Sequence, residues 1–158
     1  MHPNAERVQE ALTGLGSAAR VVELVASTRT AAEAAAAIGT TLGQIAKSLV
    51  FLAGDELVMV IASGAHRVSI AKLGERLGRP VRRADPESVK RRTGFPIGGT
   101  PPIGHHVPLR TLIDRELEQF PEIWAAAGTP HAVFRTTAGE LLRITGGELA
   151  DVKDDAVS

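Results

Sequence analysis

The chain has 158 residues, of which 44% are hydrophobic and 23% charged, and its formal net charge is zero. This size and balance are typical of one globular domain with a substantial core, and they exclude a disordered chain. Because the sequence has no cysteine, disulfides and thiolate metal sites are excluded. The N-terminus lacks the basic-then-apolar order of a signal peptide, and no apolar run approaches the roughly 18 residues of a membrane span. We therefore expect a cytoplasmic protein with no membrane association.

The first half of the chain is predicted from helix caps and turn residues. Thr30 and Glu33 have the spacing of a capping box, and Gly39 is suited to end the helix that they open. Gly54 and Asp55 separate two apolar runs, which is the pattern of a buried hairpin. The elements expected here are, in chain order, a helix over 4–14 with Asn4 as its N-cap, a strand over 21–25, a helix over 30–38, and strands over 47–52 and 57–62.

The second half continues the alternation of helices and strands. Asp85 followed by Pro86 is typical of a helix start, and Ser69 can cap an earlier helix that ends at Gly78. The elements expected here are a helix over 69–77, a strand over 81–84, a helix over 85–94, strands over 109–113 and 132–135, and a helix over 137–145.

Interspersed helices and strands favour an α+β fold, a single domain over residues 1–158 with a mixed central β-sheet flanked by helices. The acidic segment after Asp151 is predicted to be a tail, frayed over residues 154–158.

The charges are unevenly distributed along the sequence. Residues 72–92 hold eight basic and three acidic side chains, so the rest of the chain is acidic on balance. Such a region can bind phosphate groups, and it can equally be a solvated helix face. With four Phe, one Trp and no Tyr, the chain offers little surface for stacking bases. Any contact with nucleic acid should therefore be mainly with phosphate and sugar.

Two segments carry the strongest chemical signal. Lys47 opens an apolar run, so its ammonium must either extend to solvent or lie in a pocket, where burial would lower its pKa. The loop 94–105 is rich in Gly, which lets backbone amides approach a ligand, and in Pro, which restricts the surrounding backbone. Fixed amides beside a cation stabilise developing negative charge. The two segments together favour a site that acts on a carbonyl group.

Several other motifs are excluded. The sequence Ala46-Lys47-Ser48 lacks the glycines of a phosphate-binding P-loop and leads into a strand rather than a helix. The five histidines show no helical ligand spacing, so we expect no metal and no other cofactor. His105, at the end of the Gly-Pro loop, could orient a substrate or a water molecule, or could be an ordinary loop residue. No serine lies in a nucleophile-elbow pattern.

In this order and spacing the segments resemble the YbaK family, whose domain also occurs as the insertion editing domain of bacterial prolyl-tRNA synthetases. The resemblance covers residues 5–153 and implies the fold of that family. The matching segments are the alanine-rich helix from Thr30, residues 43–51, Ser63-Gly64 before Arg67, residues 71–73 and 93–95, the loop 98–104, Asp114, residues 141–146 and Ala150-Asp151.

The resemblance implies a trans-acting aminoacyl-tRNA deacylase. It would hydrolyse the ester of mischarged tRNA, above all tRNA(Pro) carrying a small wrong amino acid such as Cys or Ala. Lys47 would bind the 3′-terminal adenosine or its phosphate, and the amides of Gly98 and Gly99 would stabilise the oxyanion. No protein nucleophile is apparent, so the attacking group would be water or the thiol of a cysteinyl substrate. The substrate-binding residues implied are Thr30, Ser48, Ser63, Arg67, Thr100, Pro102, Gly104 and His105.

Partners and specificity follow from the same resemblance. The implied partners are the 3′ end of mischarged tRNA, contacted through phosphate, and prolyl-tRNA synthetase. Ser48 follows the lysine where the cysteinyl-tRNA(Pro) subgroup has threonine, so cysteinyl, alanyl, seryl and 2-aminobutyryl substrates all stay open. Two other classes of function also stay open, namely a non-catalytic module that binds aminoacyl-adenosine or the tRNA 3′ end, and a phosphate-binding regulator that uses residues 72–92.

Overall fold

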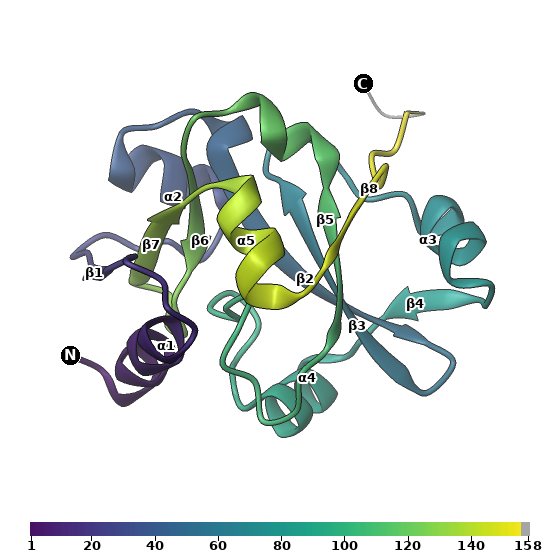
Figure 1. Ribbon diagram of the computed structural model, residues 1–158, viewed down its shortest axis with the longest axis horizontal. Helices are drawn as coiled ribbons and strands as arrows, with labels where there is room; N and C mark the ends of the chain where they lie inside the picture. Colours follow the sequence, from purple (N-terminus) through teal and green to yellow (C-terminus); the bar gives the residue numbers. More distant parts are fainter. Residues whose placement is uncertain (156–158) are drawn as a thin grey trace.

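The molecule is built around one mixed β-sheet (Figure 1). A computed structural model describes residues 1–155. Within these residues the strand order is β1-β7-β6-β2-β3-β5-β8, and β4 pairs with β2 outside this path. The strands are β1 (Val21–Glu23), β2 (Ile45–Ala53), β3 (Glu56–Ser63), β4 (Val81–Arg83), β5 (Arg110–Asp114), β6 (Ile123–Ala126), β7 (Ala132–Thr136) and β8 (Glu148–Ala150).

The sheet contains both parallel and antiparallel pairs, because β2 pairs with β3 antiparallel and with β6 parallel. The helices are α1 (Pro3–Gly14), α2 (Ala31–Ile38), α3 (Ile70–Leu77), α4 (Pro86–Thr93) and α5 (Ala138–Thr145), with 3₁₀ turns η1 (Leu42–Gln44) and η2 (Arg115–Gln119). The predicted α+β class with a mixed central sheet is therefore confirmed. No helix in residues 1–155 is long and apolar enough to cross a bilayer.

The helix ends follow the predicted caps in all but one case. The Thr30 hydroxyl accepts a hydrogen bond from the Glu33 N–H at 3.1 Å, and Gly39 ends α2 with a φ of 82°. The exception is Asn4, which is not the N-cap of α1. His2 is the cap, and its Nδ1 accepts from the Asn4 N–H at 3.0 Å. The helix starts one residue earlier than expected because Pro3 has the backbone angle that the first turn needs.

Two helical layers cover the two faces of the sheet. Even-numbered residues of β2, such as Val50 and Leu52, pack in the larger core together with buried residues of α1 and α5. Odd-numbered residues, such as Phe51 and Ala53, pack with Leu73 and other residues of the smaller core under α3. Figure 1 shows α5 in front of the sheet and α3 at the opposite end of the molecule from α1. The strict alternation places neighbouring residues of β2 in different environments.

One edge of β2 is interrupted. It pairs with β6 at Ile45 and Ala46 and with β4 at Phe51–Ala53, while β3 follows the other edge from Ala46 to Ala53. In the described part of the chain, no strand pairs with Lys47–Val50 on the interrupted edge. The strand β4 is too short, and starts too far along β2, to close the gap. This gap is where the sheet admits a cavity.

Two strands, β6 and β8, were not predicted. The alanines of β6 have low strand propensity, and β8 is three residues long, so neither segment has a clear alternating pattern. The start of the predicted tail is attached to the domain. Lys153 forms a bridge with Val68, and the Asp154 N–H donates to the Arg67 carbonyl at 2.9 Å. The remainder of that prediction, residues 156–158, lies outside the described residues.

Candidate functional site

A cavity of about 340 Å³ occupies the gap beside β2. The segments that line it are far apart in the sequence, and β2 contributes the whole interrupted edge. The other segments are the residues leading into α2, the end of β4, part of β6 and the Gly-Pro loop. The residues used below are Thr28, Arg29, Thr30, Lys47, Ser48, Arg83, Gly98, Thr100 and Trp124.

Lys47 is half-buried in the wall of this cavity. Its Nζ donates a hydrogen bond to the backbone oxygen of His66 at 2.8 Å. Burial lowers the pKa of the Lys47 ammonium, and the positive charge of Arg83 lowers it further, whereas Asp114 acts in the opposite direction. The side chain therefore does not simply extend into solvent. It holds a cation at the cavity, where the charge can act on a bound anion or carbonyl.

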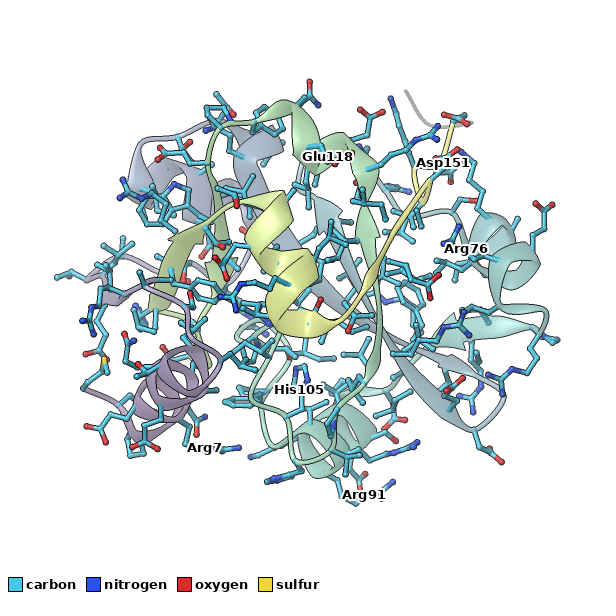
Figure 2. All side chains as sticks on the ribbon, viewed as in Figure 1. Arg7, Arg76, Arg91, His105, Glu118 and Asp151 are labelled. Atoms are coloured by element: carbon cyan, nitrogen blue, oxygen red, sulfur yellow. The ribbon has the colours of Figure 1, made fainter. Side chains whose placement is uncertain are left out.

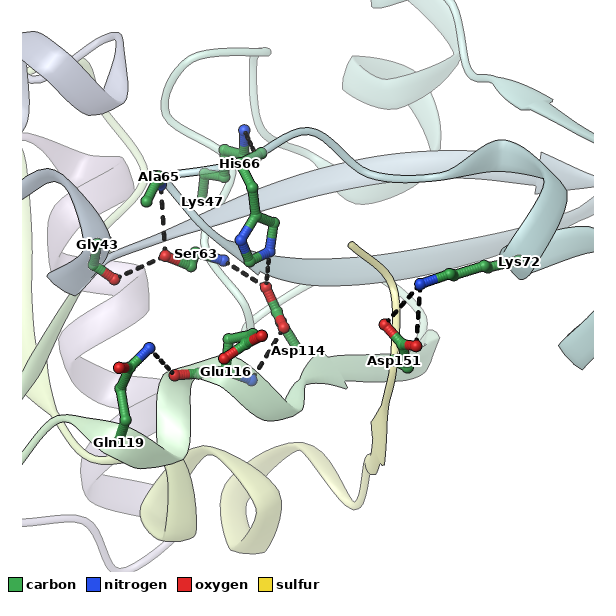
Figure 3. Close-up of polar contacts among 10 residues, drawn as sticks. All are labelled: Gly43, Lys47, Ser63, Ala65, His66, Lys72, Asp114, Glu116, Gln119 and Asp151. Atoms are coloured by element: carbon green, nitrogen blue, oxygen red, sulfur yellow. Dashed lines mark hydrogen bonds and ion pairs between the residues drawn. The ribbon is translucent and has the colours of Figure 1, made fainter. Parts of the chain in front are cut away.

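A buried polar network lies beside Lys47 (Figure 3). The carboxylate of Asp114 accepts from the Ser63 N–H and from the Glu116 N–H, each at 3.0 Å, and also from Nε2 of His66. The Ser63 hydroxyl donates to the Gly43 carbonyl at 2.8 Å. Ser63 thus supports the lysine strand rather than lining the cavity. His66 was not predicted as a site residue, because nothing in its sequence context links it to Asp114, which is 48 residues further along the chain.

The Gly-Pro loop brings one of its two predicted catalytic glycines to the cavity. Gly98 lines the cavity with a φ of +88°, and a Cβ there would lie 2.9 Å from Cγ of Arg29. Gly99 is buried behind it, where its N–H donates to the Pro96 carbonyl at 3.2 Å. A Cβ on Gly99 would lie 2.9 Å from the Thr129 backbone. The Gly99 amide is therefore occupied in a turn, and its role is one of close packing.

The remaining predicted binding residues divide into two groups. Thr30, Ser48 and Thr100 line the cavity, although the Thr100 hydroxyl donates to the Pro96 carbonyl at 2.8 Å. Pro102, Gly104 and His105 instead line a second cavity of about 160 Å³.

His105 lies in the interior of the loop (Figure 2), where its ring packs edge-on against Phe95. Its Nε2 donates to the Pro101 carbonyl at 2.6 Å. Burial lowers the pKa of His105, which favours the neutral ring. The arrangement makes His105 part of the loop's scaffold.

Three side chains of the cavity wall have buried polar atoms with no hydrogen-bond partner in the described part of the chain. They are Oγ1 of Thr28, Oγ of Ser48 and Nε1 of Trp124. Buried polar atoms are usually paired, so unpaired ones gathered at one cavity are typical of a binding site. Trp124 was not predicted as a site residue, because it belongs to the unpredicted strand β6.

The arginines at the cavity differ in their ion pairing from the basic residues near α3. Within residues 1–155, the cavity residues Arg29 and Arg83 are exposed and form no ion pair, and the same holds for Arg67, a predicted binding residue that does not line the cavity. In contrast, Lys72, Arg76 and Arg79 pair with Asp151, Glu148 and Glu56. Figure 2 shows Arg76 and Asp151 on the α3 side of the molecule and Arg91 at another edge. The basic region predicted over 72–92 is therefore divided, and its first third is neutralised.

The donor set does not point to a metal. Among the described residues, no three His, Asp or Glu side chains form a group that could hold a metal ion. The polar groups at the cavity are a lysine, arginines, hydroxyls, an indole N–H and backbone amides. These groups suit an anion, a carbonyl or a ribose rather than a divalent cation.

Comparison with known proteins identifies the family. The model of the aminoacyl-tRNA editing domain matches residues 25–144. YwhH of Bacillus subtilis (strain 168), a protein described as uncharacterized, is 32% identical over 122 residues, which cover 77% of this chain and 78% of YwhH. The proline–tRNA ligase of Nitratidesulfovibrio vulgaris (strain DP4) is 34% identical over 87 residues, which cover 54% of this chain and 15% of the ligase.

A solved structure agrees over nearly the whole chain. A protein proposed to be a trans-editing enzyme for prolyl tRNA synthetase is 49% identical, with a TM-score of 0.93 and coverage of 98% of this chain and 99% of that one. The chain belongs to the aminoacyl-tRNA editing domain family. The resemblance stated from the sequence is confirmed.

Proposed function

We propose that this protein is a trans-acting deacylase that hydrolyses the ester of mischarged tRNA. The observation that carries the proposal is that Lys47 and Gly98 line the same cavity, in a fold that belongs to the editing family. The preferred substrate would be tRNA(Pro) carrying a small wrong amino acid such as Cys or Ala. The protein would act in the cytoplasm, with prolyl-tRNA synthetase as a partner that supplies the mischarged tRNA.

The cavity has the size and the polar groups that such a reaction needs. A volume of about 340 Å³ is at the lower end of the range of small-molecule sites, which suits a small aminoacyl group on a ribose. Lys47 and the cavity arginines Arg29 and Arg83 would hold the terminal phosphate and adenosine. The N–H of Gly98 forms no backbone hydrogen bond within residues 1–155, so it is free to donate to the ester carbonyl.

The chemistry then proceeds by attack on the ester carbon. The oxygen of a water molecule, or the thiol of a cysteinyl substrate, forms a bond to the carbonyl carbon, and the carbonyl electron pair moves onto oxygen. The Gly98 amide stabilises this oxyanion, and the positive charge of Lys47 favours it. Collapse breaks the bond to the ribose oxygen, which takes up the proton lost by the attacking group. Holding the ester in a small cavity supplies part of the rate.

The first test measures release of labelled amino acid from tRNA(Pro) and other tRNAs charged with cysteine, alanine, serine or 2-aminobutyrate. Lys47→Ala should lower kcat/KM on the preferred substrate by about 10²-fold or more, which is the usual scale for losing an electrostatic stabiliser. Lys90→Ala, which removes an exposed lysine of α4, is the matched control and should not change turnover.

The outcomes separate the two leading functions. Lysine-dependent release from one or a few substrates would establish the deacylase and identify the aminoacyl group. If the folded wild-type protein released none of them, the deacylase proposal would fail. Binding of a non-hydrolysable aminoacyl-adenosine analogue would then be the property to measure, because the binding module requires it.

A further inference from the structure

The position of the Lys47 ammonium depends on a backbone atom. Its Nζ donates to the carbonyl oxygen of His66, which lies in the turn that follows β3. A carbonyl moves with its turn, whereas a carboxylate acceptor could follow the lysine by changing rotamer. The ammonium is therefore placed only as accurately as this turn is placed.

Asp114, at the end of β5, helps to hold the turn. Asp114 is 0% exposed, and the side chain of His66 is 8% exposed. Within residues 1–155 the Asp114 carboxylate has three donors, of which the Ser63 N–H lies at the end of β3 where the turn begins, His66 Nε2 belongs to the turn, and the third is the Glu116 N–H. A buried carboxylate that loses one of its donors is strongly destabilised. The pair thus fixes both ends of the segment that carries the acceptor carbonyl.

The turn also has little freedom on its other side. A Cβ on Gly64 would lie 2.7 Å from the Leu42 carbonyl oxygen and 2.8 Å from the Ala31 Cβ. Ala31 belongs to the first turn of α2, which lines the cavity. The turn is therefore packed between the lysine strand and the cavity wall, so that a shift of the turn would be transmitted to both.

We infer that the buried His66–Asp114 pair is a positioning element for Lys47, which fixes the carbonyl that orients the lysine ammonium at the cavity. His66 and Asp114 themselves do not line the cavity, so they act through Lys47 rather than on a substrate. The turnover part of the test rests on the proposed deacylase function. The spectroscopic part does not, because it reports on Lys47 in the free protein.

The spectroscopic test compares His66→Gln with His66→Leu. Glutamine can place an amide donor near the position of Nε2, whereas leucine fills a similar space without a donor. The chain has only four lysines, at positions 47, 72, 90 and 153, so NMR of ¹³C-labelled lysine can follow each one. In His66→Leu the released ammonium should become more hydrated, and the pKa of Lys47 should rise towards the ordinary lysine value of 10.5. His66→Gln should keep the lowered pKa.

The kinetic test is a double-mutant cycle on kcat/KM. His66→Leu should lower kcat/KM by about tenfold or more in the wild-type background and should add nothing to Lys47→Ala, because its effect passes through the lysine. His66→Gln should restore most of the activity. Thr145→Val is the matched control. It removes a hydroxyl that donates to the Leu141 carbonyl at 2.6 Å in α5, so it should reduce stability without moving the Lys47 pKa.

Each outcome either supports or overturns the inference about His66 and Asp114. A folded His66→Leu variant with a wild-type Lys47 pKa would overturn it, and so would an equal loss of turnover with and without Lys47, since that would show a merely structural role. If wild-type protein releases no amino acid, the deacylase proposal fails and the Lys47 pKa alone decides. If His66→Leu does not fold, His66→Asn, whose shorter amide does not reach Asp114, is measured in the same way.

Discussion

Lys47 illustrates how the surroundings of one residue set its chemistry. Burial, and next the charge of Arg83, lower the pKa of its ammonium, so it loses its proton at a lower pH than an ordinary lysine. Because the proposed mechanism uses the charged form, kcat/KM should fall on the alkaline side before pH 10.5. Arg83→Gln removes one of the lowering charges and should move the midpoint of this fall to higher pH.

This prediction is checked by measuring kcat/KM against pH, with spontaneous ester hydrolysis subtracted. The midpoint is the quantity compared, because Arg83 is also a candidate phosphate contact and its loss would lower kcat/KM at every pH. A midpoint that stays in place in Arg83→Gln would contradict the assignment of the alkaline limb to Lys47.

A second prediction at the residue scale concerns His105. Burial lowers the pKa of this ring below its ordinary value of 6.5, so between the two values the unfolded chain binds more protons than the folded one. Stability should therefore rise with pH over this window and be lost as the pH falls through 6.5. His105→Gln, which keeps a donor for the Pro101 carbonyl, should flatten this dependence. Urea unfolding above and below pH 6.5 tests the prediction, and an equally steep dependence in the variant would refute it.

At the scale of elements, α2 depends on its cap. The Thr30 hydroxyl accepts from the Glu33 N–H at 3.1 Å and also belongs to a residue that lines the cavity. Thr30→Ala should lower the free energy of unfolding by about 1 kcal/mol, the usual cost of losing an N-cap. Thr30→Asp should keep the stability, because aspartate caps equally well. Chemical denaturation measures both variants, and equal stability of Thr30→Ala and wild type would show that the cap contributes nothing.

The hairpin of β2 and β3 forms one side of the cavity through β2, and only part of this arrangement could be predicted from the sequence. Its apolar runs around Gly54-Asp55 were predictable, since each run is buried and the turn residues mark its end. The interruption on the other edge of β2 was not predictable, because it arises from where β4 and β6 end. The cavity beside Lys47 thus depends on elements whose lengths the local sequence specifies only weakly.

At the scale of the whole molecule, charge is divided between two regions. Arg29 and Arg83 line the cavity and form no ion pair with any residue of 1–155, whereas Arg76 and Arg79 are paired with Glu148 and Glu56. Each phosphate contact releases about one counterion when tRNA binds. Replacing both cavity arginines, Arg29→Gln with Arg83→Gln, should therefore reduce the slope of the logarithm of the tRNA association constant against the logarithm of salt concentration by about 2. Arg76→Gln with Arg79→Gln should leave it almost unchanged.

Titration of uncharged tRNA(Pro) at several salt concentrations measures these slopes. Because uncharged tRNA carries no aminoacyl ester, the result does not depend on turnover. Equal slopes for both double variants would mean that the tRNA approaches the molecule from another side, and would remove the cavity arginines from the proposed phosphate contacts.

The sequence by itself determined the local features of this protein. The caps of α2, α3 and α4, the hairpin and the alternation along β2 follow from residues close together in the chain, and such short-range patterns are readable without a structure. The pairing of Lys47 with the Gly-Pro loop was predicted from the residue types of the two segments, and the family resemblance added the role of Gly98, which does line the cavity with Lys47.

Only the tertiary structure decided how these features combine. It placed Gly99 behind the cavity wall and His105 at a second cavity, neutralised Lys72 and Arg76 with carboxylates from near the end of the chain, and joined His66 to Asp114. Each of these outcomes depends on contacts between segments that are distant in the sequence. The physical reason is that burial, hydrogen bonding and charge pairing are set by neighbours in space, and short-range patterns along the chain do not reveal which residues those neighbours are.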